Sequence, residues 1–118
     1  MDQLFESILR GAVDAGASDI HIKPDAPVVF RVERTLVPVN VPLPGDGWVR
    51  SVLDQVVPAE LKKRLAEQRE IDFAFGLPEL GRFRVNAFYQ RGQPTIAVRV
   101  VKTSVPTFQE LNLPSIIQ

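Results

Sequence analysis

The start of the chain carries apolar side chains at the spacing of an amphipathic helix. Over residues 2–16 they fall on one helical face, at Leu4, Phe5, Ile8, Leu9, Ala12 and Val13. Asp2 suits the cap position, because its carboxylate can accept hydrogen bonds from the unpaired N–H groups of the first turn. Gly16 suits the left-handed position just past the last turn. The pattern predicts a helix whose apolar face covers a sheet.

Two further helices are predicted after the Pro- and Gly-rich turn of residues 42–48. The first has its apolar face at Trp48, Val52, Leu53 and Val56. The second covers residues 58–70 and opens on Pro58, whose missing N–H group is well tolerated in a first turn.

Elsewhere apolar and polar residues alternate, which is the period of a half-buried strand. Pro38 and Pro42 place the third strand at an edge of the sheet or end it early, since proline cannot donate to a strand ladder. A turn at Arg91-Gly92 joins the last two strands. The predicted strands cover residues 18–24, 28–33, 36–41, 70–75 and two segments of 81–100.

The order of one helix, three strands, two helices and three strands favours an α+β fold. Short turns between consecutive strands indicate antiparallel pairing, so we predict a six-stranded antiparallel sheet with helices packed on one face. Such an arrangement is PAS-like. A length of 118 residues, with 45% hydrophobic and 24% charged residues, fits one globular domain.

Strand alternation also separates apolar from basic side chains. Phe83 and Val85 point to the core face of the predicted sheet. Arg82 and Arg84 point the other way, and Arg99 of the neighbouring strand joins them. The polar face also holds His21, Arg31 and Asp72 by the same count. Since a guanidinium group matches the geometry of a phosphate, these arginines either solvate a sheet face or form an anion site, and the pattern leaves both interpretations open.

Charge and composition exclude several classes of function. Fourteen basic and fourteen acidic residues give no net charge, which argues against a general nucleic-acid surface. The lack of cysteine and the single histidine exclude thiolate and multi-histidine metal sites. No apolar run approaches the ~20 residues of a membrane span, and the start lacks the pattern of a signal peptide. We therefore expect a cytoplasmic protein that does not insert into a membrane.

No complete catalytic motif is found in the sequence. Residues 76–83 have glycines at the spacing of a phosphate-binding loop, but Arg82 and Phe83 stand where that loop needs lysine and then serine or threonine. The serine, aspartate and histidine of residues 18–21 are too close in the chain to build a nucleophilic triad. An enzyme in its own right has almost nothing in its favour, and we predict no catalytic or metal-ligating residues in this chain.

Four separated segments of the chain resemble one family. They are residues 16–32, 70–92, 96–101 and 105–114, which contain GASDIHIKP, GRFRVNAF, IAVRVV and VPTFQELNLP. In this order they are similar to the N-terminal domain of PilT-type twitching-motility ATPases, part of a larger group of secretion ATPases. The stretch GRFRVNAF followed by QRG is closer to the retraction enzymes than to the extension or secretion members.

The resemblance implies a PAS-like N-terminal domain that precedes a RecA-like ATPase domain with the Walker motifs. In the family six subunits form a ring, and ATP hydrolysis drives type IV pilus retraction. The chain would be the nucleotide-sensing and subunit-interface domain, inactive alone, with ATP and Mg²⁺ held mainly by the RecA-like domain. The expected partners are the RecA-like domains of the same and neighbouring subunits and the inner-membrane platform at the pilus base, without nucleic acid.

The resemblance also assigns roles to individual arginines. Arg84 in RFRVN and Arg99 in AVRV match the family's arginines that reach the ATP phosphates in the cleft between the two domains. Arg82 and Arg91 are weaker candidates for the same contact. The four arginines are the predicted cofactor-binding residues of the chain.

Domain boundaries follow from the same resemblance. We expect residues 1–104 to form the N-terminal domain and residues 105–118 to form a connector to a RecA-like ATPase domain, which makes the chain an excised piece rather than a solitary domain. One departure from the family is the sequence Glu33-Arg34-Thr35, where a glycine usually follows the acidic residue. The geometry of that turn is therefore open.

Two alternative functions remain. The chain can be a stand-alone PAS-like module that binds a small ligand or a protein, which would bind its ligand without any motor domain. It can also be the same domain from a pilus-extension or type II secretion ATPase.

Overall fold

The computed structural model describes residues 2–101, which form three helices and six strands in the predicted order. The helices are α1 (Gln3–Ala15), α2 (Asp46–Val56) and α3 (Ala59–Gln68). The strands are β1 (Asp19–Ile22), β2 (Val29–Val32), β3 (Thr35–Pro38), β4 (Glu70–Leu77), β5 (Gly81–Gln90) and β6 (Gln93–Val101). The predicted connector and the boundary at residue 104 lie outside the described residues.

Helix α1 begins and ends where the sequence predicts. The Asp2 side chain accepts a hydrogen bond of 2.9 Å from the backbone N–H of Phe5, which satisfies one of the free donors of the first turn. Gly16 has a φ of 72°, and its N–H closes the last turn from the left-handed conformation that glycine adopts without strain. Phe5, Leu9 and Ala12 are buried on the face toward the sheet.

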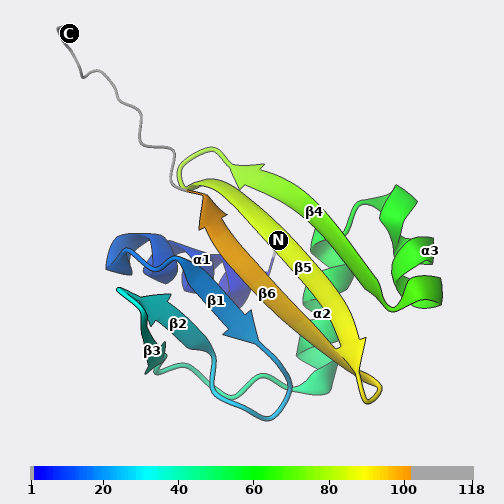
Figure 1. Ribbon diagram of the computed structural model, residues 1–118, viewed down its shortest axis with the longest axis horizontal. Coiled ribbons are helices and arrows are strands. Elements are labelled where there is room, and N and C mark those ends of the chain that lie inside the picture. Colours follow the sequence, from blue (N-terminus) through cyan, green and yellow to red (C-terminus); the bar gives the residue numbers. More distant parts are fainter. Residues whose placement is uncertain (1, 102–118) are drawn as a thin grey trace, which may run out of the picture.

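The six strands described in residues 2–101 form a single sheet in the order β3-β2-β1-β6-β5-β4, and every neighbouring pair is antiparallel. β1 pairs with both β2 and β6, so a strand near the start of the chain lies beside the last strand described (Figure 1). β3 is an edge strand and ends at Pro38, as the proline pattern predicts. This order places β1, β6 and β5 in the middle of the sheet.

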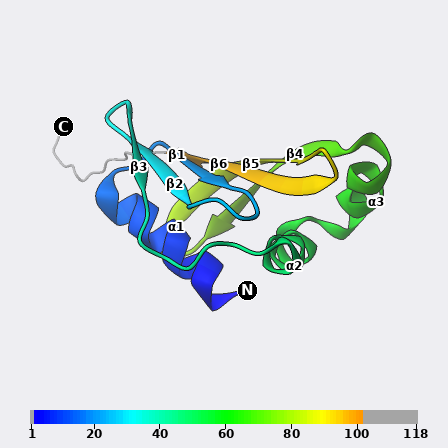
Figure 2. The same ribbon diagram turned by 90° about the horizontal axis from the view of Figure 1, so that it is seen from below.

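The helices leave one face of the sheet uncovered within residues 2–101. Figure 2 shows α1 and α2 below the sheet and open space above it. The core lies between the sheet and these helices, and it includes Phe5, Leu9, Ile20, Val49, Val52, Phe83, Ile96 and Val98. Phe75 stacks on Phe83 with 5.3 Å between the ring centroids. The predicted α+β fold with an antiparallel sheet and helices on one face is confirmed, and the PAS-like comparison stays a prediction.

The turn that departs from the family pattern is a two-residue hairpin turn. Val32 of β2 pairs with Thr35 of β3, so only Glu33 and Arg34 connect the strands. Both residues have positive φ angles, 49° and 70°, which is the type I′ geometry that matches the twist of paired strands. The missing glycine therefore leaves the hairpin intact and puts two side chains in the left-handed region.

Candidate functional site

The outer face of the sheet, which is the face away from α1 and α2, carries a row of charged side chains on four adjacent strands. The register pairs Asp19 of β1 with Arg31 of β2 and with Arg99 of β6, and it pairs Arg99 with Arg84 of β5. Side chains of directly paired residues stand about 4.5–5.5 Å apart at their Cβ atoms. Arg31, Asp19, Arg99 and Arg84 therefore form one continuous row across the sheet, called the arginine row below.

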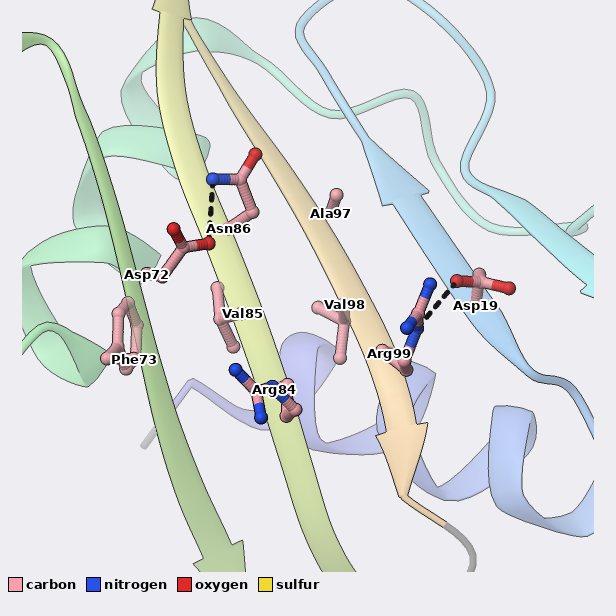
Figure 3. A pocket seen from close by; sticks show the side chains of 9 residues that line it. All are labelled: Asp19, Asp72, Phe73, Arg84, Val85, Asn86, Ala97, Val98 and Arg99. Atoms are coloured by element: carbon pink, nitrogen blue, oxygen red, sulfur yellow. Dashed lines mark hydrogen bonds and ion pairs between the residues drawn. The ribbon is translucent and has the colours of Figure 1, made fainter.

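Part of this row borders a shallow depression of about 370 Å³ on the outer face. Figure 3 shows Arg84 and Arg99 near one end of the depression and Asn86 with Asp72 toward the other. Its lining residues are Asp19, Asp72, Phe73, Arg84, Val85, Asn86, Ala97, Val98 and Arg99. The depression thus has a basic end and a polar end with a carboxylate.

Asp19 lies between two arginines of the row. Its Oδ2 is 3.7 Å from Nε of Arg31, and its Oδ1 is 3.8 Å from Nε of Arg99. The Ser18 hydroxyl donates a hydrogen bond of 2.7 Å to Asp19 Oδ2. Three guanidinium groups against one carboxylate leave the row with two positive charges, and that excess favours an anion at the surface.

Arg84 differs from Arg99 in its surroundings. Within residues 2–101 it makes no ion pair, although it faces Arg99 directly across β5 and β6. Like charges placed directly opposite each other in a sheet are destabilising, and an anion between them removes that cost. A phosphate group fits this position, since each guanidinium offers several N–H donors in a plane.

At the polar end of the depression, the side-chain amide of Asn86 binds two carboxylates. Asn86 Nδ2 donates hydrogen bonds of 3.0 Å to Glu70 Oε2 and 3.0 Å to Asp72 Oδ1. Both carboxylates come from β4, the edge strand next to β5. The acidic groups are therefore tied to Asn86 and kept apart from the arginines.

Arg82 and Arg91, the two weaker candidates for phosphate contact, lie at opposite ends of β5. Arg82 is on the outer face of β5, two residues from Arg84 and paired with Val101. Arg91 is in the turn between β5 and β6, seven residues from Arg84, which at about 3.3 Å per residue is roughly 20 Å away. The fold thus brings Arg82 close to Arg84 and Arg99 but places Arg91 at the far end of the strands.

A second basic cluster connects α2 to the turn between β5 and β6. Arg50 donates a 2.6 Å hydrogen bond from Nε to Asp46 and a 3.1 Å hydrogen bond from Nη2 to the carbonyl of Gly92. The hydrogen bond to Asp46 raises the pKa of Arg50, which stays protonated. Arg69 lies 4.2 Å over the ring of Tyr89. Arg50 and Arg69 are thus engaged with neighbouring groups and attach α2 and the end of α3 to the hairpin of β5 and β6.

Two features of the site are missed by the sequence interpretation. The pairing of Asp19 with Arg31 and Arg99, and the link from Asn86 to Glu70 and Asp72, both depend on which residues face each other across strands. The alternation of polar residues gives the face of each side chain but not its partner. Only the register supplies the partners.

Other kinds of site find no support in the described part of the chain. Residues 2–101 hold no group of three or more His, Asp or Glu side chains placed to bind a metal ion. None of the helices in this range is long and apolar enough to cross a membrane.

Comparison with known proteins supplies relatives along nearly the whole chain. No protein-family model matches it. It is 36% identical over 115 residues to the type IV pilus ATPase PilU of Pseudomonas aeruginosa, covering 97% of the chain and 30% of that protein. It is 29% identical over 111 residues to the type IV pilus retraction ATPase PilT of the same organism, covering 94% of the chain and 32% of that protein.

Solved structures also match nearly the whole chain. The crystal structure of the pilus retraction motor PilT with bound ADP matches with a TM-score of 0.78 and 33% identity, covering 92% of the chain and 32% of that protein. The ATPase DotB of Legionella pneumophila, at 22% identity and a TM-score of 0.70, shares the fold over 97% of the chain and 33% of its own length. The chain therefore spans about a third of the length of the proteins that it matches.

Proposed function

Because the chain belongs to the PilT-type ATPases and corresponds to their N-terminal domain, we propose that it is the nucleotide-sensing and subunit-interface domain of a hexameric motor that drives type IV pilus retraction. The observation that carries this proposal is the position of Arg84 beside Arg99 on a sheet face that no helix of residues 2–101 covers. The names of the relatives, PilU and PilT, support the pilus as the machine.

In this proposal the nucleotide is ATP, held mainly by a RecA-like domain. The bound ADP in the PilT structure supports a nucleotide as the ligand of the whole protein. Arg84 and Arg99 provide guanidinium N–H donors, which fit phosphate oxygens and do not fit a metal ion. Mg²⁺ would therefore be held by the other domain and would neutralise charge on the phosphates.

The two arginines act when the cleft between the domains closes. Their guanidinium groups then meet the terminal phosphate, where negative charge redistributes as the phosphoryl group is transferred. A positive group already placed at that position lowers the energy of the transition state. In an open cleft the arginines stay in water, so the same contact reports to the domain interface whether nucleotide is present.

The proposal also names the partners and the location of the protein. The partners are the RecA-like domains of the same and neighbouring subunits, because a head-to-tail interface that closes on itself produces a ring. The inner-membrane platform at the pilus base is the further partner, and the protein is cytoplasmic and peripheral to that membrane. The 118-residue chain alone is catalytically inactive, since it has no Walker motif.

Turnover of the protein that includes the ATPase domain tests this proposal. Arg84→Ala and Arg99→Ala should each lower kcat by roughly 100-fold, because each removes a donor from the phosphate contact. The matched control is Arg64→Ala, which removes an exposed arginine of α3 and should leave turnover unchanged. Circular dichroism establishes that each variant is folded. Wild-type turnover in Arg84→Ala or Arg99→Ala would remove that residue from the site.

A further inference from the structure

Asp19 is the one carboxylate of the arginine row, and it lies between two of its arginines. It lies on β1, a central strand, and meets one arginine from each neighbouring strand. Its side chain is only 24% exposed, whereas the side chain of Arg99 is 74% exposed. The carboxylate is therefore the more enclosed member of the pair, and the guanidinium extends into solvent.

The position of this carboxylate is fixed by the residue that precedes it in the chain. The Ser18 hydroxyl donates to Asp19 Oδ2, and the backbone of Ser18 is bonded on both sides, to the carbonyl of Arg31 at 2.8 Å and to the N–H of Val100 at 2.9 Å. A carboxylate held in this way is a fixed charge. Arginine has several rotatable bonds and a large rotamer entropy, so it takes its position from such a charge.

We propose that Asp19 is a positioning residue for Arg99, which it holds in the orientation that presents its outer edge to an anion. The inference rests on the proposed function for the identity of that anion as a nucleotide phosphate. The ion pair runs through Nε of Arg99, the nitrogen nearest the aliphatic stem. The two terminal nitrogens, Nη1 and Nη2, are the outer edge that can bind two phosphate oxygens together.

This assignment gives the arginines of the row different roles. Arg99 is oriented by a carboxylate before any anion arrives, while Arg84 has no ion pair within residues 2–101. Arg31 shares the same carboxylate, since it lies 3.7 Å from Oδ2 while Arg99 lies 3.8 Å from Oδ1. Arg31 also offsets part of the negative charge that an approaching phosphate meets at Asp19.

Asp19 therefore has two opposite effects on an anion. Its charge repels the phosphate, which weakens binding, and its contact with Arg99 orders the guanidinium, which favours the reacting geometry. Removing the charge alone should strengthen or preserve ground-state binding while slowing the chemical step. A residue with only a structural role would change neither quantity in a folded protein.

The first test measures the order of the Arg99 side chain in the 118-residue chain. Asp19→Asn keeps the size of the side chain and an acceptor for Ser18. In this variant the ¹H–¹⁵N NOE of the Arg99 Nε–Hε group should fall toward the value of an exposed arginine. Arg31→Gln should raise the same NOE, because it leaves the whole charge of the carboxylate to Arg99. Asp72→Asn, which alters another carboxylate lining the depression, is the matched control and should leave the NOE unchanged.

The second test measures anion binding and the kinetics of ATP hydrolysis. In the 118-residue chain, Asp19→Asn should bind inorganic tripolyphosphate at least as tightly as the wild type. In the protein that includes the ATPase domain, Asp19→Asn should lower kcat by about tenfold without raising KM, because a loosened Arg99 is misplaced in the transition state. Asp19→Glu, which restores the charge, should recover part of that loss.

The outcomes separate this inference from the proposed function. An unchanged Arg99 NOE in both Asp19→Asn and Arg31→Gln overturns the positioning role, whatever the ATPase assay gives. A lower NOE in Asp19→Asn together with normal turnover in Arg99→Ala supports the positioning role and removes Arg99 from the phosphate contact. A raised KM with unchanged kcat in Asp19→Asn also overturns the inference.

Discussion

Single residues in the left-handed backbone region mark where the fold accepts strain. Within residues 2–101 the non-glycine positions with positive φ are Asp25, Glu33, Arg34, Arg69 and Arg91. Arg69 ends α3 in this conformation, and its guanidinium gains a contact with the ring of Tyr89. Arg34 is exposed and makes no ion pair in that range, so its strain has no such compensation.

Replacing Arg34 by glycine should stabilise the protein. A left-handed conformation costs an L-residue about 1–2 kcal/mol, and the greater flexibility of glycine in the unfolded chain offsets about 0.5–1 kcal/mol of the gain. Urea denaturation of Arg34→Gly should therefore show a free energy of unfolding higher by about 0.5–1 kcal/mol. Thr35→Gly, at the first position of β3, is the control and should lower it. A loss of stability in Arg34→Gly would contradict the type I′ geometry.

Among the elements, α1 shows most directly how local chemistry sets a boundary. Asp2 satisfies a backbone donor at its start, where the partial positive charge of the helix end also favours a carboxylate. Asp14, exposed in the last turn, faces the partial negative charge of the other end. The same residue type is thus favourable at one end of α1 and unfavourable at the other.

This asymmetry predicts opposite effects for two similar substitutions. Asp2→Ala should lower the free energy of unfolding by about 1 kcal/mol, because it leaves the Phe5 N–H without its acceptor. Asp14→Ala should leave it unchanged or raise it by about 0.3–1 kcal/mol, because it removes a repulsion with the helix end. Thermal unfolding followed by circular dichroism measures both. Equal losses in the two variants would show that the cap has no specific role.

At the scale of the whole molecule, the two faces of the sheet separate the hydrophobic core from the proposed anion site. Its inner face contacts the helices and supplies core residues such as Phe83, Val85 and Val98, all at most 2% exposed. Its outer face carries the arginine row and the depression beside it. Substitutions of outer-face side chains should therefore leave the core intact, even where they change the proposed anion binding.

Two phenylalanines on one strand test this separation. Phe83→Ala should lower the free energy of unfolding by about 3–5 kcal/mol, because it empties a fully buried position stacked on Phe75. Phe88, on the outer face of β5, is only partly buried, and Phe88→Ala should cost about 1 kcal/mol or less. Urea denaturation of both variants gives the comparison. Similar losses would contradict the assignment of faces in β5.

The elements and their faces are determined by the sequence alone, because helix and strand periods are local properties of the chain. The spacing around Leu9 predicts α1, and the alternation through Phe83 and Arg84 gives the inner and outer faces of β5, as observed. The α+β class follows from the order of the elements. The predicted match of Arg84 and Arg99 to the family's arginines also comes from the sequence, and it stays a prediction.

The tertiary structure alone decided which side chains meet. Asp19 and Arg99 are eighty residues apart in the chain, and only the pairing of β1 with β6 places them in one row. The pairing of β4 with β5 likewise links Asn86 to two carboxylates of β4. Local periodicity fixes the face on which a side chain lies, but its partner depends on long-range strand pairing, which no local pattern contains.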